Sequence, residues 1–198
     1  QAEVLASLAG SSQSTISTMV LFASQTEQDS FDSSLANLET IMTRTQNLFA
    51  DEIFENGSQG ENRDATLEEV LHLVTDKGWD EAFPSVWGEK KGSSIANAMD
   101  TARGGYFETI PTSYPANAWY TYDDRTCDYG CQVTEYFYWA LTSLLGAQDY
   151  PGRYDEIGHE WKANTPTLLQ SMDPSVFAIL TDSAYQLPMV LPDGTYMR

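Results

Sequence analysis

Residues 66–72 read TLEEVLH and carry a histidine three residues after a glutamate, at Glu69 and His72. On a helix, side chains three residues apart lie on one face, so the carboxylate and the imidazole can meet at one point. The same spacing recurs at Glu156 and His159, and these two histidines are the only ones in the chain. Carboxylate and imidazole are common metal ligands. We therefore expect a metal site, built first of all on residues 66–72.

The residues around this stretch predict a helix that starts at Asp64 or Thr66 and ends at Gly78, because glycine commonly terminates helices. Its apolar positions recur at helical spacing and form one stripe, at Leu67, Val70, Leu71 and Val74. Glu69 and His72 then lie beside the stripe, at the edge of the core.

The rest of the chain predicts a mainly α (α+β) fold in a single compact domain over residues 16–198, after a flexible lead-in at 1–15. Residues 16–23 form a strand or the start of a helix. We expect five further helices, over about 32–54, 93–103, 132–145, 154–169 and 173–182. Between them, residues 106–129 make a long irregular segment rich in Tyr, Trp, Pro and Asp, which is typical of a functional loop.

Composition narrows the class of protein. The 198 residues are 41% hydrophobic, enough for a single buried core. The formal net charge is −19, from 29 acids against 10 Lys and Arg, which argues against nucleic acid as a partner. The longest candidate for a membrane span, residues 16–23, is too short to insert into a membrane.

The two cysteines, Cys127 and Cys131, flank Gly130, which permits a tight turn. We expect them to form a disulfide, which implies an oxidising compartment. Asn56 begins a glycosylation sequon, and the chain begins with Gln1 rather than Met, so we expect that a leader or a longer N-terminal part has been removed. These features together predict a secreted, extracellular protein.

Residues 64–145 resemble zincin metallopeptidases of the gluzincin branch, in which the third metal ligand is a glutamate on a later helix. Residues 68–72 match the metal-binding helix, and residues 134–140, with Glu135, are similar to the glutamate helix of the lethal factor-like group. The resemblance implies a zincin-like helical core with long aromatic-rich loops. It makes His72 and Glu135 metal ligands.

The same resemblance implies that Glu69 is the general base and that Tyr129, or alternatively Tyr122, stabilises the oxyanion. The sequence departs from the family at Glu68, which stands where the first ligand would be a histidine. Two carboxylates and one imidazole can bind zinc, and iron or manganese are alternatives. A peptidase is then one outcome, and a degenerate site is another.

Three alternatives remain open. His72 can hydrogen-bond within the fold, with Glu68 and Glu69 as solvated acids of a first helical turn. The chain can be a non-enzymatic extracellular module whose Tyr- and Trp-rich loops bind a protein partner or a second copy. The order of acids and histidines also matches di-iron carboxylate bundles, at Glu39, Glu69, His72, Glu135, Glu156 and His159.

Two further expectations concern a partner for Glu135 and a cluster of acidic and aromatic residues. Glu135 stands alone among apolar residues of its helix, so it should have a partner. A cluster of acidic and aromatic residues could bind calcium or a sugar, at Tyr120, Tyr122, Asp123, Asp124 and Asp128.

Overall fold

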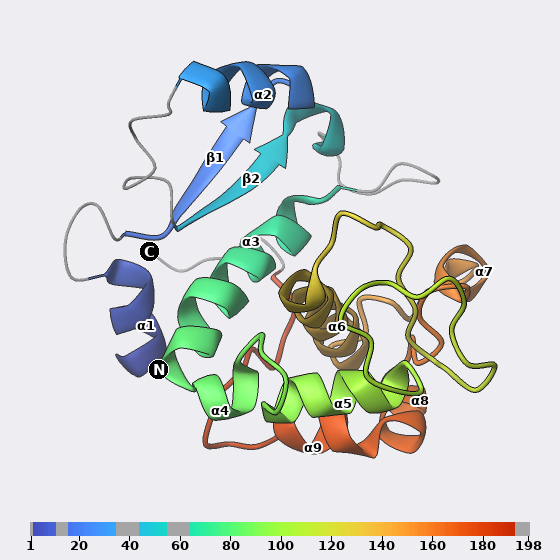
Figure 1. Ribbon diagram of the computed structural model, residues 1–198. Helices are drawn as coiled ribbons and strands as arrows, with labels where there is room; N and C mark the ends of the chain where they lie inside the picture. The colour runs from blue at the N-terminus through green and yellow to red at the C-terminus, as the bar shows by residue number, and fades with distance from the viewer. Residues whose placement is uncertain (1, 11–15, 35–43, 55–63, 193–198) are drawn as a thin grey trace. The chain divides into compact units, whose positions relative to one another are not determined.

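The computed structural model describes residues 2–10, 16–34, 44–54 and 64–192 (Figure 1). These residues are mainly helical and include a two-stranded parallel sheet. They divide into two compact units, Ala2–Phe83 and the residues from Pro84 onward, and each is described by itself. The single domain expected over residues 16–198 stays a prediction. No helix among the described residues has the length and apolar character needed to cross a membrane.

The first unit contains helix α1 (Ala2–Ala9), strand β1 (Thr18–Phe22), helix α2 (Gln25–Ser34), strand β2 (Thr45–Phe49) and helix α3 (Thr66–Val74). β1 and β2 pair in parallel, with Thr18 opposite Thr45 and Phe22 opposite Phe49. A 3₁₀ turn, Ala50–Glu52, follows β2, and a π-helical turn, Thr75–Asp80, continues α3.

Arg44 joins three parts of this unit. Its Nη2 donates to the carbonyl oxygen of Ser7, at the end of α1, over 2.7 Å, and to that of Lys77, in the π-helical turn, over 3.1 Å. Its Nη1 pairs with Glu81. The same turn packs closely on α1, because a Cβ built on Gly78 would lie 2.9 Å from a methyl carbon of Val4. The position therefore favours glycine.

Three expectations for this unit are wrong. Residues 2–9 form α1, with Val4 buried, instead of a flexible lead-in. The helix expected over 32–54 is replaced at its C-terminal end by β2, where Leu48 and Phe49 pair with β1; residues 35–43 lie outside the described residues. Of the two alternatives for residues 16–23, a strand or the start of a helix, the structure has the strand, β1.

The third error concerns the apolar stripe of α3. Leu67 is 55% exposed and Val70 is 40% exposed, whereas His72 and Leu73 are buried. The helix itself is confirmed, although Gly78 lies inside the π-helical turn and does not end it. The buried face of α3 is thus rotated away from the predicted one, toward the histidine.

The second unit contains helices α4 (Pro84–Trp87), α5 (Ser94–Ala102), α6 (Tyr129–Leu144), α7 (Arg153–Ile157), α8 (Pro166–Met172) and α9 (Pro174–Leu180). α6 is its central helix and packs against α5, α8 and α9 (Figure 1). The helices predicted over 93–103, 132–145 and 173–182 are confirmed as α5, α6 and α9.

The single helix expected over 154–169 is wrong. α7 ends at Ile157, and α8 begins only at Pro166, after the N-cap Thr165. The residue before a proline is disfavoured in helical conformation, so Pro166 starts a helix and cannot continue one. The residues between the two helices instead form an isolated antiparallel bridge between Trp161 and Tyr120.

The buried Asp173 carboxylate accepts hydrogen bonds from three groups in the core of this unit. Its Oδ2 accepts hydrogen bonds from the Tyr136 hydroxyl, over 2.5 Å, and from Trp119 Nε1, over 2.9 Å. Its Oδ1 accepts from the backbone N–H of Val176 and caps α9. Burial raises the pKa of Asp173 above its ordinary value, although these hydrogen bonds act to lower it.

The predicted disulfide between Cys127 and Cys131 is confirmed. It closes the turn that leads into α6, where the Asp128 side chain accepts from the backbone N–H of Cys131 and caps the helix. Asp124 accepts in the same way from Thr126. Tyr120 is fully buried, so the residues of the expected calcium or sugar cluster do not share one exposed face.

Candidate metal centre

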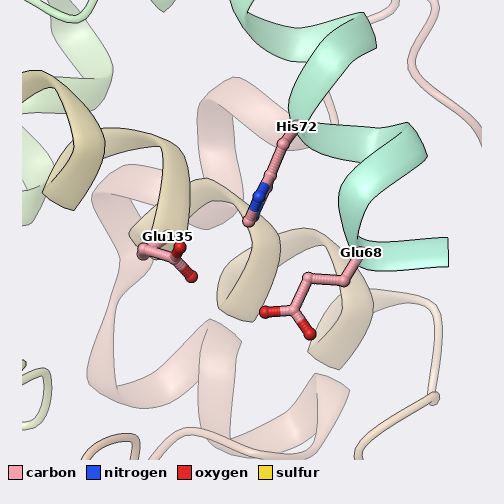
Figure 2. A group of neighbouring side chains, drawn as sticks. All are labelled: Glu68, His72 and Glu135. Atoms are coloured by element: carbon pink, nitrogen blue, oxygen red, sulfur yellow. The ribbon is translucent and has the colours of Figure 1, made fainter. Parts of the chain in front are cut away.

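Helix α3 presents Glu68 and His72 one turn apart, and each offers a ligand atom within 4.8 Å of the other's. His72 is buried and Glu68 is half-buried, so both donors are shielded from full solvent competition. Figure 2 shows both side chains leaving successive turns of α3, with the imidazole extended away from the helix axis. The first two residues of the expected ligand set are thus brought together.

The start of α3 is fixed by Asp64. One of its carboxylate oxygens accepts from the backbone N–H of Thr66 over 2.9 Å, and the other accepts from that of Phe54 over 2.8 Å. Hydrogen bonding, first of all from the Thr66 side chain, lowers the pKa of Asp64. The carboxylates of Glu68 and Glu69 then lie in the first turn, where the positive end of the helix dipole stabilises them.

Glu69 lies on the Nδ1 side of the imidazole. Its Oε2 is 3.8 Å from His72 Nδ1 and accepts a hydrogen bond of 2.5 Å from Nε2 of Gln46, on β2. Burial raises the pKa of Glu52, and repulsion from Glu69 adds to that shift. A carboxylate that faces the outer nitrogen of a histidine is the arrangement commonly found behind metal-ligating histidines, where it orients the ring.

Glu135 lies on α6 in the second unit (Figure 2). The sequence predicts a partner for Glu135 without naming it, and in the structure the Tyr122 side chain forms a hydrogen bond with the Glu135 carboxylate. Burial raises the pKa of Tyr122 strongly, and repulsion from Glu135 and Glu160 adds to the shift. The Tyr122 hydroxyl therefore stays protonated and acts as a hydrogen-bond donor.

Tyr129, the other tyrosine expected at the site, is engaged elsewhere in the second unit. It is the first residue of α6, and its hydroxyl donates to Asp100 Oδ2 over 3.1 Å. Its ring centroid lies 5.3 Å from the Arg103 guanidinium, within reach of a cation–π interaction. Of the two tyrosines named as alternatives, Tyr122 is the one that contacts Glu135.

The second Glu-x-x-His tetrad does not lie on one helix. Glu156 is in α7 and pairs with Nη1 of Arg153 over 2.9 Å, whereas His159 follows the end of the helix and is exposed. Their side chains therefore lack the shared helical face that a di-iron bundle requires. Glu39 and Asn56 lie outside the described residues.

Glu68 and His72, both on α3, pair a carboxylate with an imidazole, and Glu135 of the second unit is the further carboxylate that the sequence predicts for the site. Such a mixed oxygen and nitrogen set suits zinc, iron and manganese. Sequence reasoning missed Gln46, which hydrogen-bonds Glu69, and it did not identify Tyr122 as the partner of Glu135. Nothing in the local sequence marks Gln46, because its position depends on the pairing of β2 with β1.

Comparison of the chain with protein-family models, with curated proteins and with solved structures found no match. The resemblance of residues 64–145 to zincins therefore has no independent support and stays a hypothesis.

Proposed function

We propose that this protein binds one divalent metal ion through Glu68, His72 and Glu135. The observation that carries the proposal is the pair on α3, where a carboxylate and a buried imidazole offer ligand atoms within 4.8 Å. The chemistry of Glu135 is consistent with the third position, because a carboxylate that accepts a hydrogen bond from Tyr122 keeps a second oxygen for a metal.

Zinc is the first candidate metal, with iron or manganese as alternatives. Two anionic ligands and a neutral imidazole neutralise a divalent charge, which offsets the cost of desolvating the carboxylates. In this account His72 coordinates through Nε2, while Glu69 faces Nδ1 and orients the ring. Gln46 in turn holds Glu69 in place.

A hydrolase function, with a peptide as substrate, extends this proposal. A divalent ion in such a site supplies a Lewis acid that lowers the pKa of a bound water. The residue available as general base is Glu69, and Tyr122 is the hydroxyl donor beside Glu135. The 3.8 Å approach of Glu69 to Nδ1 favours its orienting role over the role of base, so metal binding is the function that we put first.

We also propose that the protein is secreted. The disulfide between Cys127 and Cys131 supports an oxidising compartment. The chain's strongly acidic composition would keep it soluble outside the cell.

Thermal unfolding with and without a chelator tests the metal proposal. A ligand at about 100 times its Kd stabilises the folded state by about 2.7 kcal/mol, so EDTA should lower the Tm of the zinc-loaded wild type. His72→Ala and Glu135→Gln should abolish the shift. The matched control is Glu108→Gln, which removes an exposed carboxylate from the second unit and should leave the shift intact. A wild-type transition that does not move on chelation would contradict the proposal.

One observation favours a second candidate, an extracellular interaction module. Three tyrosines of the second unit are more than two-fifths exposed, at Tyr106, Tyr150 and Tyr154. Tyrosine is enriched at protein interfaces because its ring buries a large area while its hydroxyl stays hydrogen-bonded. Sedimentation at micromolar concentration tests self-assembly, and a strict monomer would argue against that form of the module.

A further inference from the structure

A pocket of about 510 Å³ opens in the second unit. Its wall comes from the irregular segment before α6 and from the residues after α7. The apolar part of the wall is formed by Ile110, Pro111, Tyr114, Pro115 and Tyr122. The volume falls within the range of small-molecule sites, about 300–1,000 Å³.

Backbone hydrogen bonds join the two stretches of chain that line the pocket, around residue 121 and around residue 160. Thr121 donates its backbone N–H to the carbonyl oxygen of Glu160 over 2.8 Å, and Lys162 donates in return to that of Trp119 over 3.0 Å. The bridge between them is anchored by Tyr120 and Trp161, which are fully buried with ring centroids 6.2 Å apart. The backbone of Thr121 and Lys162 is therefore held in place without a ligand, which lowers the entropic cost of binding.

Hydrogen bonds also join two lining residues of the segment before α6, Tyr114 and Tyr122. The Tyr114 hydroxyl donates to the carbonyl oxygen of Tyr122 over 3.2 Å and accepts from the backbone N–H of Tyr122 over 3.3 Å. The Tyr114 side chain is therefore held against the backbone of Tyr122.

Basic side chains make up a larger share of the charged residues around the pocket than in the chain as a whole. The chain has ten Lys and Arg and two His against 29 acids, yet Arg125, His159 and Lys162 all line this one pocket. Lys162 Nζ is fixed by a hydrogen bond of 2.6 Å to the carbonyl oxygen of Ala118 and keeps further N–H groups to donate. A quarter of the basic side chains thus gather where a small ligand can reach them.

Two acids share the lining, Asp123 and Glu160. One oxygen of Glu160 accepts a hydrogen bond of 2.9 Å from Trp139 Nε1. These two acids equal in number the two cations Arg125 and Lys162, so the lining lacks the excess of positive charge that would favour a dianion such as a phosphate monoester over a carboxylate. An arginine guanidinium also matches the two oxygens of a carboxylate with two parallel N–H donors.

We propose that this pocket binds a small organic monocarboxylate. The carboxylate lies among Arg125, His159 and Lys162, and the apolar body of the ligand packs against Tyr114 and Tyr122. The site is separate from the proposed metal ligands, although Tyr122 borders both through its hydrogen bond with Glu135.

Binding of benzoate tests the proposal, followed in ¹H–¹⁵N spectra of the full chain with EDTA present, so that the result does not depend on the metal. Benzoate should shift the amide signals of Thr121, Tyr122 and His159. Arg125→Gln should weaken binding about 10-fold, the loss expected for charge-assisted hydrogen bonds. Lys90→Gln removes an exposed positive charge of the same unit outside the pocket and should leave the affinity unchanged.

The neutral isostere benzamide and the dianion phenyl phosphate complete the test. Benzamide should bind about 10-fold more weakly than benzoate, because it lacks the charge that the three bases recognise. Equal affinity for benzamide, tighter binding of phenyl phosphate, or no shift of the pocket amides with benzoate would each overturn the proposal.

Discussion

Replacing Glu69 with Gln should lower the affinity for zinc about 10-fold if Glu69 orients His72. Loss of a carboxylate behind a metal-ligating histidine costs about 10- to 100-fold in affinity. The separation of 3.8 Å between Glu69 Oε2 and His72 Nδ1 exceeds the 2.7–2.9 Å of a charge-assisted hydrogen bond, so we place the loss at the lower end of that range. The expected cost is about 1.4 kcal/mol of binding free energy.

Competition of the protein with a chromophoric zinc chelator measures this affinity directly. Glu3→Gln is the matched control, because it removes an exposed carboxylate from α1 in the same unit, and it should leave the affinity unchanged. Unchanged zinc affinity in Glu69→Gln would refute the orienting role. If a peptide-cleaving activity were lost at unchanged affinity, Glu69 would instead be the general base.

Three further predictions concern the fold. Asp173→Asn should destabilise the protein by about 1–3 kcal/mol, because the amide keeps one acceptor oxygen where the carboxylate uses both, so either the two side-chain donors or the cap of α9 loses its acceptor. Burial raises the folded pKa of Asp173, so its stabilising contribution is present below about pH 4 and is lost as pH rises through the folded pKa. Urea unfolding should therefore show a larger cost near pH 4 than near pH 7. Gly78→Ala should cost about 1–3 kcal/mol in the same assay, because its Cβ would meet α1 at 2.9 Å, and an unchanged midpoint would contradict that packing. Cys127→Ser with Cys131→Ser should cost about 2 kcal/mol for so short a loop, and alkylation of the wild type without reductant should add no mass; two labels would refute the disulfide.

Local signals in the sequence were sufficient for three helices of the second unit, α5, α6 and α9. α6 follows from its dense apolar periodicity, and α5 follows from the cap at Ser93, whose side chain accepts from the backbone N–H of Ala96. α9 follows from Asp173 in the same way. In each case the residues that start the helix are neighbours in sequence of the residues that they cap, so composition and spacing alone determine the outcome.

Non-local pairing explains where the sequence failed. Leu48 and Phe49 fit both a helical and an extended pattern, and their parallel pairing with β1 decides for the strand. Gln46 reaches Glu69 only as a consequence of that pairing. Likewise, the pocket at His159 depends on the bridge between Tyr120 and Trp161, which joins residues 41 positions apart.

The candidate metal residues were predicted in part. Helical spacing alone brings Glu68 and His72 together on α3, and the sequence identified both. The solitary charge of Glu135 in an apolar helix indicated a partner, but the identity of Tyr122 depends on how the irregular segment before α6 folds back. Such a segment carries no periodicity from which its path can be inferred.

The metal content of the purified protein tests the central claim most directly. After reconstitution with zinc and removal of excess metal, elemental analysis of the wild type should find about one equivalent per chain, and His72→Ala should retain almost none. Iron and manganese are tested in parallel, because the donor set admits both. Less than about a tenth of an equivalent of every metal in the wild type would contradict the account.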